Sequence, residues 1–205
     1  MIHSDDLETI KVFALKDRDN LNTFLRICSC FEDVTAHLRD EFVSTINDFL
    51  RQKLENYGWQ LEDRMSGKWT QFYPNLLIYK FKFGVINYHI MLEWGRGSRC
   101  VVYGVRNGGT KEKPLKPSQE KNNKIWEILN GKMEQGGKTN DWWSWYKYLE
   151  RPYNDWNNSE ALIPMFESVS LYKSRKEFGP MVKSIGEKLV NAALSLDSWF
   201  ESKGD

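Results

Sequence analysis

A run of apolar residues at helical spacing, between positions 31 and 54, constrains the fold of this chain most. Its members recur at steps of three and four, the pattern of one buried helix face: Phe31, Val34, Leu38, Phe42, Ile46, Phe49, Leu50 and Leu54. Gly58 follows, and glycine is favoured just after a helix because it tolerates a positive φ. We therefore predict a long helix ending before Gly58. Residues 5–15 fit either a helix or a first strand.

Beyond this helix the pattern changes to short segments rich in β-branched and aromatic residues. In residues 76–84 the side chains alternate, with Leu77, Tyr79, Phe81 and Phe83 on one face and Lys80 and Lys82 on the other. Similar segments follow at 85–95 and 99–109, and residues 58–69 open the series. Short alternating segments joined by turn residues predict an antiparallel meander.

The C-terminal half predicts further helices. Residues 107–123 form a polar loop, within which Ser118 can cap a short helix that stops at Gly131. Pro180 suits the first turn of a closing helix, whose buried stripe is Met181, Ile185, Leu189, Ala193, Leu196 and Phe200. The expected fold class is α+β, an antiparallel β-meander of three to five strands packed against a long N-terminal helix and a C-terminal helix.

We expect residues 1–205 to form one domain, divisible into a helix-plus-sheet lobe, 1–110, and a helical, aromatic-rich lobe, 118–205. The chain carries 29 Lys and Arg against 28 Asp and Glu, a net charge of +1. This balance gives no general electrostatic reason to bind nucleic acid or an anionic membrane.

Membrane insertion and export are also disfavoured. No apolar run approaches the roughly 20 residues of a membrane helix, and the acidic N-terminal stretch lacks the layout of a signal peptide. Three cysteines cannot form a paired disulfide framework, which fits a reducing compartment. We expect a cytoplasmic protein with no membrane partner.

Patterns that carry chemistry are sparse. Cys28 and Cys30 form a C-x-C without a second pair, the histidines are scattered, and no G-x-S-x-G elbow occurs. We therefore predict no catalytic residue, no metal and no cofactor. His89 and Glu93 share one face of a predicted strand. Such a pair could perform acid–base chemistry, although a structural hydrogen bond or a solvent-facing pair is the commoner role.

Residues 140–156 hold four tryptophans and three tyrosines. In one interpretation Trp142, Trp145, Tyr146 and Leu149 form a buried helical face that ends at Pro152. In the other, part of the stretch stays exposed, because tryptophan and tyrosine clusters mark binding surfaces. The partner-binding residues expected in that case are Trp142, Trp143, Tyr153, Asp155 and Trp156.

Several of these features together resemble the C-terminal region of a group within the PD-(D/E)XK nuclease superfamily. They are Tyr103-Gly104 at the end of a strand pair, the tryptophans from Trp142 to Trp145, and Asp155-Trp156. The resemblance covers roughly residues 75–200 and implies an accessory part. The superfamily's Glu-x-Lys is missing after Glu93, and it recurs only as Glu201-Ser202-Lys203 at the C-terminal tail. We therefore expect no nuclease activity.

The first functional hypothesis is a non-enzymatic protein that binds or regulates a macromolecular partner, more readily a protein than a nucleic acid. By analogy with the resemblance, this could be an inhibitor or accessory subunit in a bacterial or phage defence system. An alternative is nucleic-acid binding through Lys111, Lys113, Lys116, Lys121 and Lys124, with the aromatic residues as a stacking platform. A third is a divergent Mg²⁺-dependent nuclease built from Glu93, Asp63 and a migrated lysine.

Overall fold

The computed structural model describes residues 4–69, 71, 73–82, 85–95, 100–107, 119–133 and 135–201. The chain divides into two compact units, Met1–His37 (unit 1) and Leu38–Asp205 (unit 2). Unit 1 holds helix α1 (Ser4–Ala14) and the first part of α2 (Arg18–Leu54). Helix α2 begins where Asp17 Oδ1 accepts the backbone N–H of Asn20 at 2.8 Å, an N-terminal cap. The ambiguous segment 5–15 is helical as far as Ala14.

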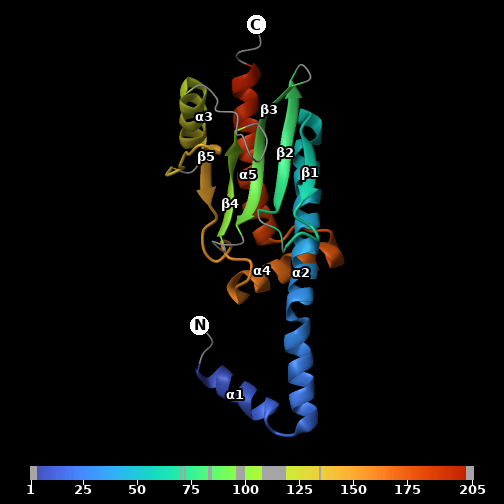
Figure 1. Ribbon diagram of the computed structural model, residues 1–205. Helices are drawn as coiled ribbons and strands as arrows, with labels where there is room; N and C mark the ends of the chain where they lie inside the picture. Colours follow the sequence, from blue (N-terminus) through green and yellow to red (C-terminus); the bar gives the residue numbers. More distant parts are fainter. Residues whose placement is uncertain are drawn as a thin grey trace. The chain divides into compact units, whose positions relative to one another are not determined.

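Unit 2 contains the rest of α2 and a five-stranded antiparallel sheet (Figure 1). The strands are β1 (Gln60–Arg64), β2 (Asn75–Lys82), β3 (Val85–Gly95), β4 (Cys100–Arg106) and β5 (Trp143–Tyr148). They pair in sequence order, each with the next. The remaining helical elements are η1 (Glu55–Tyr57), α3 (Gln119–Lys132), α4 (Ser159–Arg175) and α5 (Pro180–Glu201). The predicted α+β class and the antiparallel meander are confirmed.

One face of the sheet packs against helices. In Figure 1 the sheet lies in front of α5, and α3 lies beside β5. The cross-strand row Ile78–Ile90–Val105–Trp145 is fully buried on this side, because its members alternate with residues of the opposite face. The stripe of α5 predicted from Met181 to Leu196 is buried as well; the side chain of Phe200 lies outside the described residues.

Polar side chains connect the sheet to the helices. Asp197 of α5 is buried and accepts hydrogen bonds from Trp59 Nε1 at 2.9 Å and from Lys80 Nζ at 2.7 Å. Helix α4 is joined to α2 by Tyr172, whose hydroxyl donates to Asp48 at 2.9 Å. Lys80, which the alternation placed opposite Leu77, therefore lies on the helix side of β2.

Three expectations about the elements need correction. Strand β5, Trp143–Tyr148, stands where a helical face was predicted over residues 142–149, so that prediction is wrong. Helix α4 was not predicted, and Asn158 caps it by accepting the backbone N–H of Glu160. The apolar stripe of α2 is buried from Phe42 onward, but Phe31 and Val34 are 51% and 63% exposed.

Strand β4 precedes the 107–118 segment and β5 follows it, and the two strands pair with each other. Both parts of the chain therefore contribute to one sheet. Gly58 adopts a φ of 73°, as expected for a residue that closes a helix, although the closure follows the short helix η1. Helix α3 covers the predicted short helix. Its predicted cap, Ser118, lies outside the described residues.

Candidate functional site

The second face of the sheet carries no helix among the described elements (Figure 1). We call it the open face. Strand register assigns to it one residue in two of each strand: Gln60, Glu62, Arg64, Asn75, Leu77, Tyr79, His89, Met91, Glu93, Val102, Gly104, Arg106, Trp143, Tyr146 and Tyr148. Its centre is a small apolar cluster of Leu77, Met91, Val102 and Trp143.

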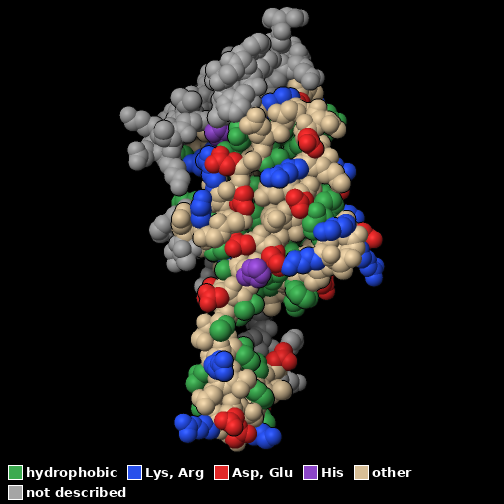
Figure 2. All heavy atoms as spheres, turned by 90° about the vertical axis from the view of Figure 1, so that its right-hand side faces the viewer, with side chains coloured by type: hydrophobic (Ala, Val, Ile, Leu, Met, Phe, Trp, Pro, Cys, Tyr) green, Lys and Arg blue, Asp and Glu red, His purple; other side chains and the backbone are tan. Residues whose placement is uncertain are grey.

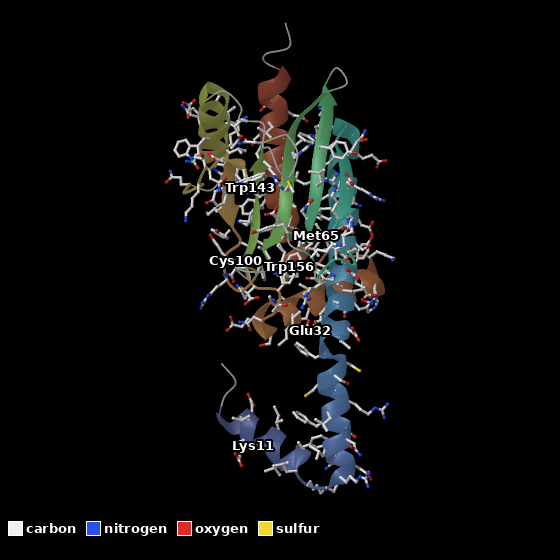
Figure 3. All side chains as sticks on the ribbon, in the orientation of Figure 1. Lys11, Glu32, Met65, Cys100, Trp143 and Trp156 are labelled. Atoms are coloured by element: carbon white, nitrogen blue, oxygen red, sulfur yellow. The ribbon has the colours of Figure 1, made fainter. Side chains whose placement is uncertain are left out.

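A β-bulge turns Trp143 toward the open face. The register steps by one residue on β4, from Val105 to Arg106, and by two on β5, from Trp145 to Trp143. An extra residue in one strand reverses the side that the following side chain faces. Trp145 therefore points into the helix layer, where Asn130 accepts its Nε1 hydrogen at 3.1 Å, while Trp143 joins the open-face cluster (Figure 3).

Gly104 allows β5 to lie close to β4 on this face. A Cβ atom at position 104 would overlap the carbonyl oxygen of Trp145 and lie 2.7 Å from Cα of Tyr146. Tyr146 is the cross-strand partner of Gly104, and its ring lies 6.1 Å from that of Trp143 and 6.0 Å from that of Tyr148. The missing side chain therefore permits an aromatic row along β5.

A pocket of about 300 Å³ lies beside this aromatic row. Its lining combines four rings with a few polar groups: Tyr73, Glu93, Gly95, Cys100, Val102, Asn140, Trp143, Tyr146 and Tyr148. Tyr73 and Tyr148 are exposed at its rim, whereas Trp143 is 6% exposed. A concave site of this size, with four rings among its nine lining residues, can accept a side chain or a small molecule.

Paired charges flank the pocket. Glu93 and Arg106 lie 3.5 Å apart on neighbouring strands, and both side chains are largely buried. The guanidinium of Arg106 also lies 5.3 Å from the centre of the Trp142 ring, a cation–π contact. Nearer the sheet edge, Arg64 pairs with Glu62 at 2.6 Å. In each of these two pairs, one acidic side chain of the open face neutralises one basic side chain.

His89 lies on the open face in the same row as Arg106. Burial lowers the pKa of His89 below its ordinary value of 6.5, and the positive charges of Arg64 and Arg106 lower it further, against the opposing effect of Glu62. The imidazole is therefore neutral at pH 7. Its Nε2 atom is buried without a hydrogen-bond partner among the described residues. The sequence placed His89 and Glu93 on one face correctly, but Glu93 pairs with Arg106.

Trp156 is not on the surface, so its expected exposure is wrong. The ring is fully buried and packs edge-on against Phe42 at 5.4 Å, near α4 in Figure 3. The buried side chain of Arg39 donates to the Trp156 carbonyl oxygen at 3.3 Å and to Asn157 Oδ1 at 2.9 Å. The Arg39 guanidinium also lies 5.5 Å from the ring centre of Trp69. Trp156 thus belongs to the core.

The other expected binding residues fall into two groups. Trp142 and Trp143 lie at the open face, half-buried and buried respectively, so Trp143 offers less surface than expected. Tyr153 and Asp155 form the turn before α4. There the Tyr153 carbonyl accepts the Trp156 Nε1 hydrogen at 3.0 Å, and Asp155 Oδ1 accepts the Asn157 N–H at 3.0 Å. Both are half-buried, and the structure does not bring them to the pocket.

The nucleic-acid and nuclease alternatives receive little geometric support. Lys111, Lys113 and Lys116, and the side chain of Lys121, lie outside the described residues, while Lys124 is exposed and pairs with Glu127 at 3.2 Å. Asp63 pairs in register with Leu76, which faces the helices, whereas Glu93 lies on the open face. The two carboxylates therefore do not converge on one metal. The side chain of Glu201 and residues 202–205 lie outside the described part.

The residues that the structure describes contain no group of three or more His, Cys, Asp or Glu side chains arranged to hold a metal ion. None of the described helices has the length and apolar character needed to span a bilayer. Comparison with known proteins found no matching family model, curated protein or solved structure. The resemblance to the PD-(D/E)XK group therefore stays a prediction.

The sequence contained a signal for this site that helical spacing concealed. Tyr146 and Tyr148 are two residues apart, the spacing of side chains on one face of a strand. In the structure both line the pocket, together with Cys100. Tyr73, which adopts a positive φ of 58°, had no such signal because it lies in a connection between strands. Arg106 and Glu93 could be matched only after the register of β3 and β4 was known.

Proposed function

We propose that this chain is a non-enzymatic binding protein whose partner is another protein, and that the open face is its interaction surface. The observation that carries the proposal is the row of rings on β5 beside a pocket of about 300 Å³. Tyrosine and tryptophan provide large rigid contact area with few torsions to freeze, and they dominate the centres of protein interfaces. The pocket would receive one side chain of the partner.

The charges of the open face favour a protein over a nucleic acid. Glu62 and Glu93 offset Arg64 and Arg106. Lys138, 5.8 Å from the Tyr148 ring, adds one positive charge, a small excess for binding phosphate groups. The carboxylate of Glu93 lines the pocket itself and would repel a phosphate. Figure 2 shows a further side of the molecule, around β1 and the adjacent part of α2, where acidic and basic side chains are interspersed.

We propose that the chain has no enzymatic activity because Glu93 and His89, the two groups on this face best suited to proton transfer, are poorly placed to exchange a proton with a substrate. A general acid or base must reach the proton that it transfers. Glu93 is held by Arg106, and the Nε2 atom of His89 exposes almost no surface. Plasmid degradation in Mg²⁺ or Mn²⁺, abolished by Glu93→Ala, would contradict this part of the proposal.

The setting implied by the resemblance, a regulator or inhibitor in a bacterial or phage defence system, remains a proposal by analogy. It does not depend on the open face. A cytoplasmic location and a protein partner are consistent with this setting, and both stand as expectations.

The test of the function is retention of a partner by the purified, tagged protein from a lysate of its source organism, with and without nuclease treatment. We expect nuclease-resistant retention of a defined protein, and a loss of at least about tenfold in Tyr146→Ala/Tyr148→Ala. Tyr57→Ala is the matched control, because Tyr57 is exposed to a similar degree outside the open face. Retention that nuclease abolishes, or that both variants reduce equally, would overturn the proposal.

A further inference from the structure

Unit 1 exposes an unusual amount of apolar side chain. Of the large hydrophobic residues that are exposed in the described chain, ten lie between Leu7 and Val34, each 38–73% exposed. Figure 2 shows such green side chains at the surface of this unit. Apolar side chains exposed in this number on one part of a folded chain indicate an interaction site.

Part of this exposed set follows helical spacing. On α2, Ile27, Phe31 and Val34 are separated by four and three residues, the spacing of one helix face. On α1, Leu7 and Ile10 are three residues apart. The apolar stripe of α2 is buried from Phe42 onward and exposed at Phe31 and Val34 in unit 1. The part of α2 in unit 1 therefore has an apolar face that remains exposed.

The exposed apolar area matches what a dimer needs. Ten side chains of this size, about half exposed on average, present roughly 900 Å² of apolar surface, and a stable interface buries about 800 Å² on each partner. A short turn joins α1 to α2 (Figure 1), and both helices carry exposed apolar side chains. Two copies would supply four helices, enough for a bundle with a shared apolar centre.

The net charge of unit 1 indicates which kind of partner could cover its exposed apolar side chains. Residues 1–37 contain seven Asp and Glu and four Lys and Arg, a net charge of −3. Helices that lie on anionic membranes have basic polar faces, and nucleic-acid binding needs excess positive charge. The acidic net charge therefore favours a protein as the partner of unit 1. A second copy is by construction a source of an equally large apolar helical surface, and a two-fold arrangement buries both at once.

We propose that α1 and the N-terminal part of α2 form a homodimerisation element, in which unit 1 of one copy covers unit 1 of another. The interface would include Ile27, Phe31 and Val34, which share one face of α2, together with Phe13 on α1. This inference uses surface separate from the open face, so it does not depend on the proposed function.

Sedimentation of the full-length chain over a range of concentrations tests the inference. We expect the wild type to be a dimer at micromolar concentration, and Ile27→Lys/Val34→Lys to raise the dimer Kd at least about 100-fold. The control is Ile163→Lys/Phe166→Lys on α4, whose side chains are 58% and 60% exposed, close to the 61% and 63% of the first pair. This control should remain dimeric.

A second measurement keeps the test informative if the lysine variants misfold. Cys28 and Cys30 are exposed on the same part of α2. A bifunctional maleimide should therefore link two copies of the Cys100→Ser protein, and Cys28→Ser/Cys30→Ser should abolish the link. A wild type that stays monomeric throughout, or equal weakening by both lysine pairs, would overturn the inference. So would dimers that do not cross-link through these cysteines.

Discussion

Gly104 occupies the point at which β4 and β5 approach too closely for a side chain. A Cβ atom there would overlap the Trp145 carbonyl oxygen. We expect Gly104→Ala to reduce the free energy of unfolding by about 2–3 kcal/mol, because the strands must separate or shift. Urea unfolding monitored by circular dichroism measures this. Gly131→Ala in α3 is the control, since a Cβ there meets nothing within 4 Å, and it should be neutral or stabilise by up to about 1 kcal/mol.

Arg39 is a buried charge at 2% exposure, held by carbonyl oxygens and tryptophan rings. Arg39→Met should destabilise the protein by about 2–4 kcal/mol, because the acceptors on Trp156 and Asn157 lose their donor and the cation–π contact is lost. Arg51→Met, at an exposed position of the same helix, should change stability by less than about 0.5 kcal/mol. Equal effects in chemical unfolding would show that Arg39 does not organise this cluster.

His89 makes stability depend on pH. Its pKa in the folded protein is lowered below 6.5, chiefly by burial. As pH falls through 6.5 the unfolded chain takes up a proton that the folded protein does not yet bind. The free energy of unfolding therefore decreases as pH drops below 6.5 and is highest above it.

We expect wild type to lose more stability than His89→Gln between about pH 7.5 and about pH 5.5, because the variant lacks this titrating group. Urea unfolding at the two values measures the difference. His37→Gln, on the exposed surface of α2, controls for replacing a histidine. An identical pH dependence in wild type and His89→Gln would contradict the assignment.

Among the secondary-structure elements, β5 is one whose conformation depends on packing against its neighbours and not on its local sequence pattern. Four of its neighbouring apolar residues happen to fit steps of three and four, which predicted a helix. The chain instead forms a strand, since β4 offers a partner and the bulge lets Trp143 and Trp145 reach opposite faces. The long helix, the meander and the closing helix were predictable because their periodicity is sustained. The open-face pocket was not, because it depends on register between β3, β4 and β5.

Trp145 anchors β5 to α3. The ring is fully buried, and Asn130 accepts its hydrogen bond. Trp145→Ala should cost about 3–5 kcal/mol of unfolding free energy, through lost burial and a cavity. Trp126→Ala, on the more exposed side of α3, should cost roughly 1 kcal/mol. Thermal and urea unfolding compare the two, and a larger loss in Trp126→Ala would contradict the packing described for β5.

At the scale of the whole molecule, the aromatic residues divide between two tasks. Trp69, Trp145 and Trp156 are buried and build the core of unit 2, as the core interpretation of the aromatic stretch expected for part of it. Tyr146 and Tyr148 line an open pocket instead. Unit 1 contributes exposed apolar side chains that are mainly aliphatic. The near-zero net charge of the chain suits recognition through shape and apolar area rather than through long-range attraction.

The most direct measurement of the central claim is photo-crosslinking from the open face. Tyr148 is replaced by p-benzoylphenylalanine in one protein and Tyr57 in another, and each is irradiated in a nuclease-treated lysate of the source organism. The account predicts one defined adduct with a different protein from position 148 and none from position 57. Adducts of equal yield from both positions, or no protein adduct from position 148, would contradict it.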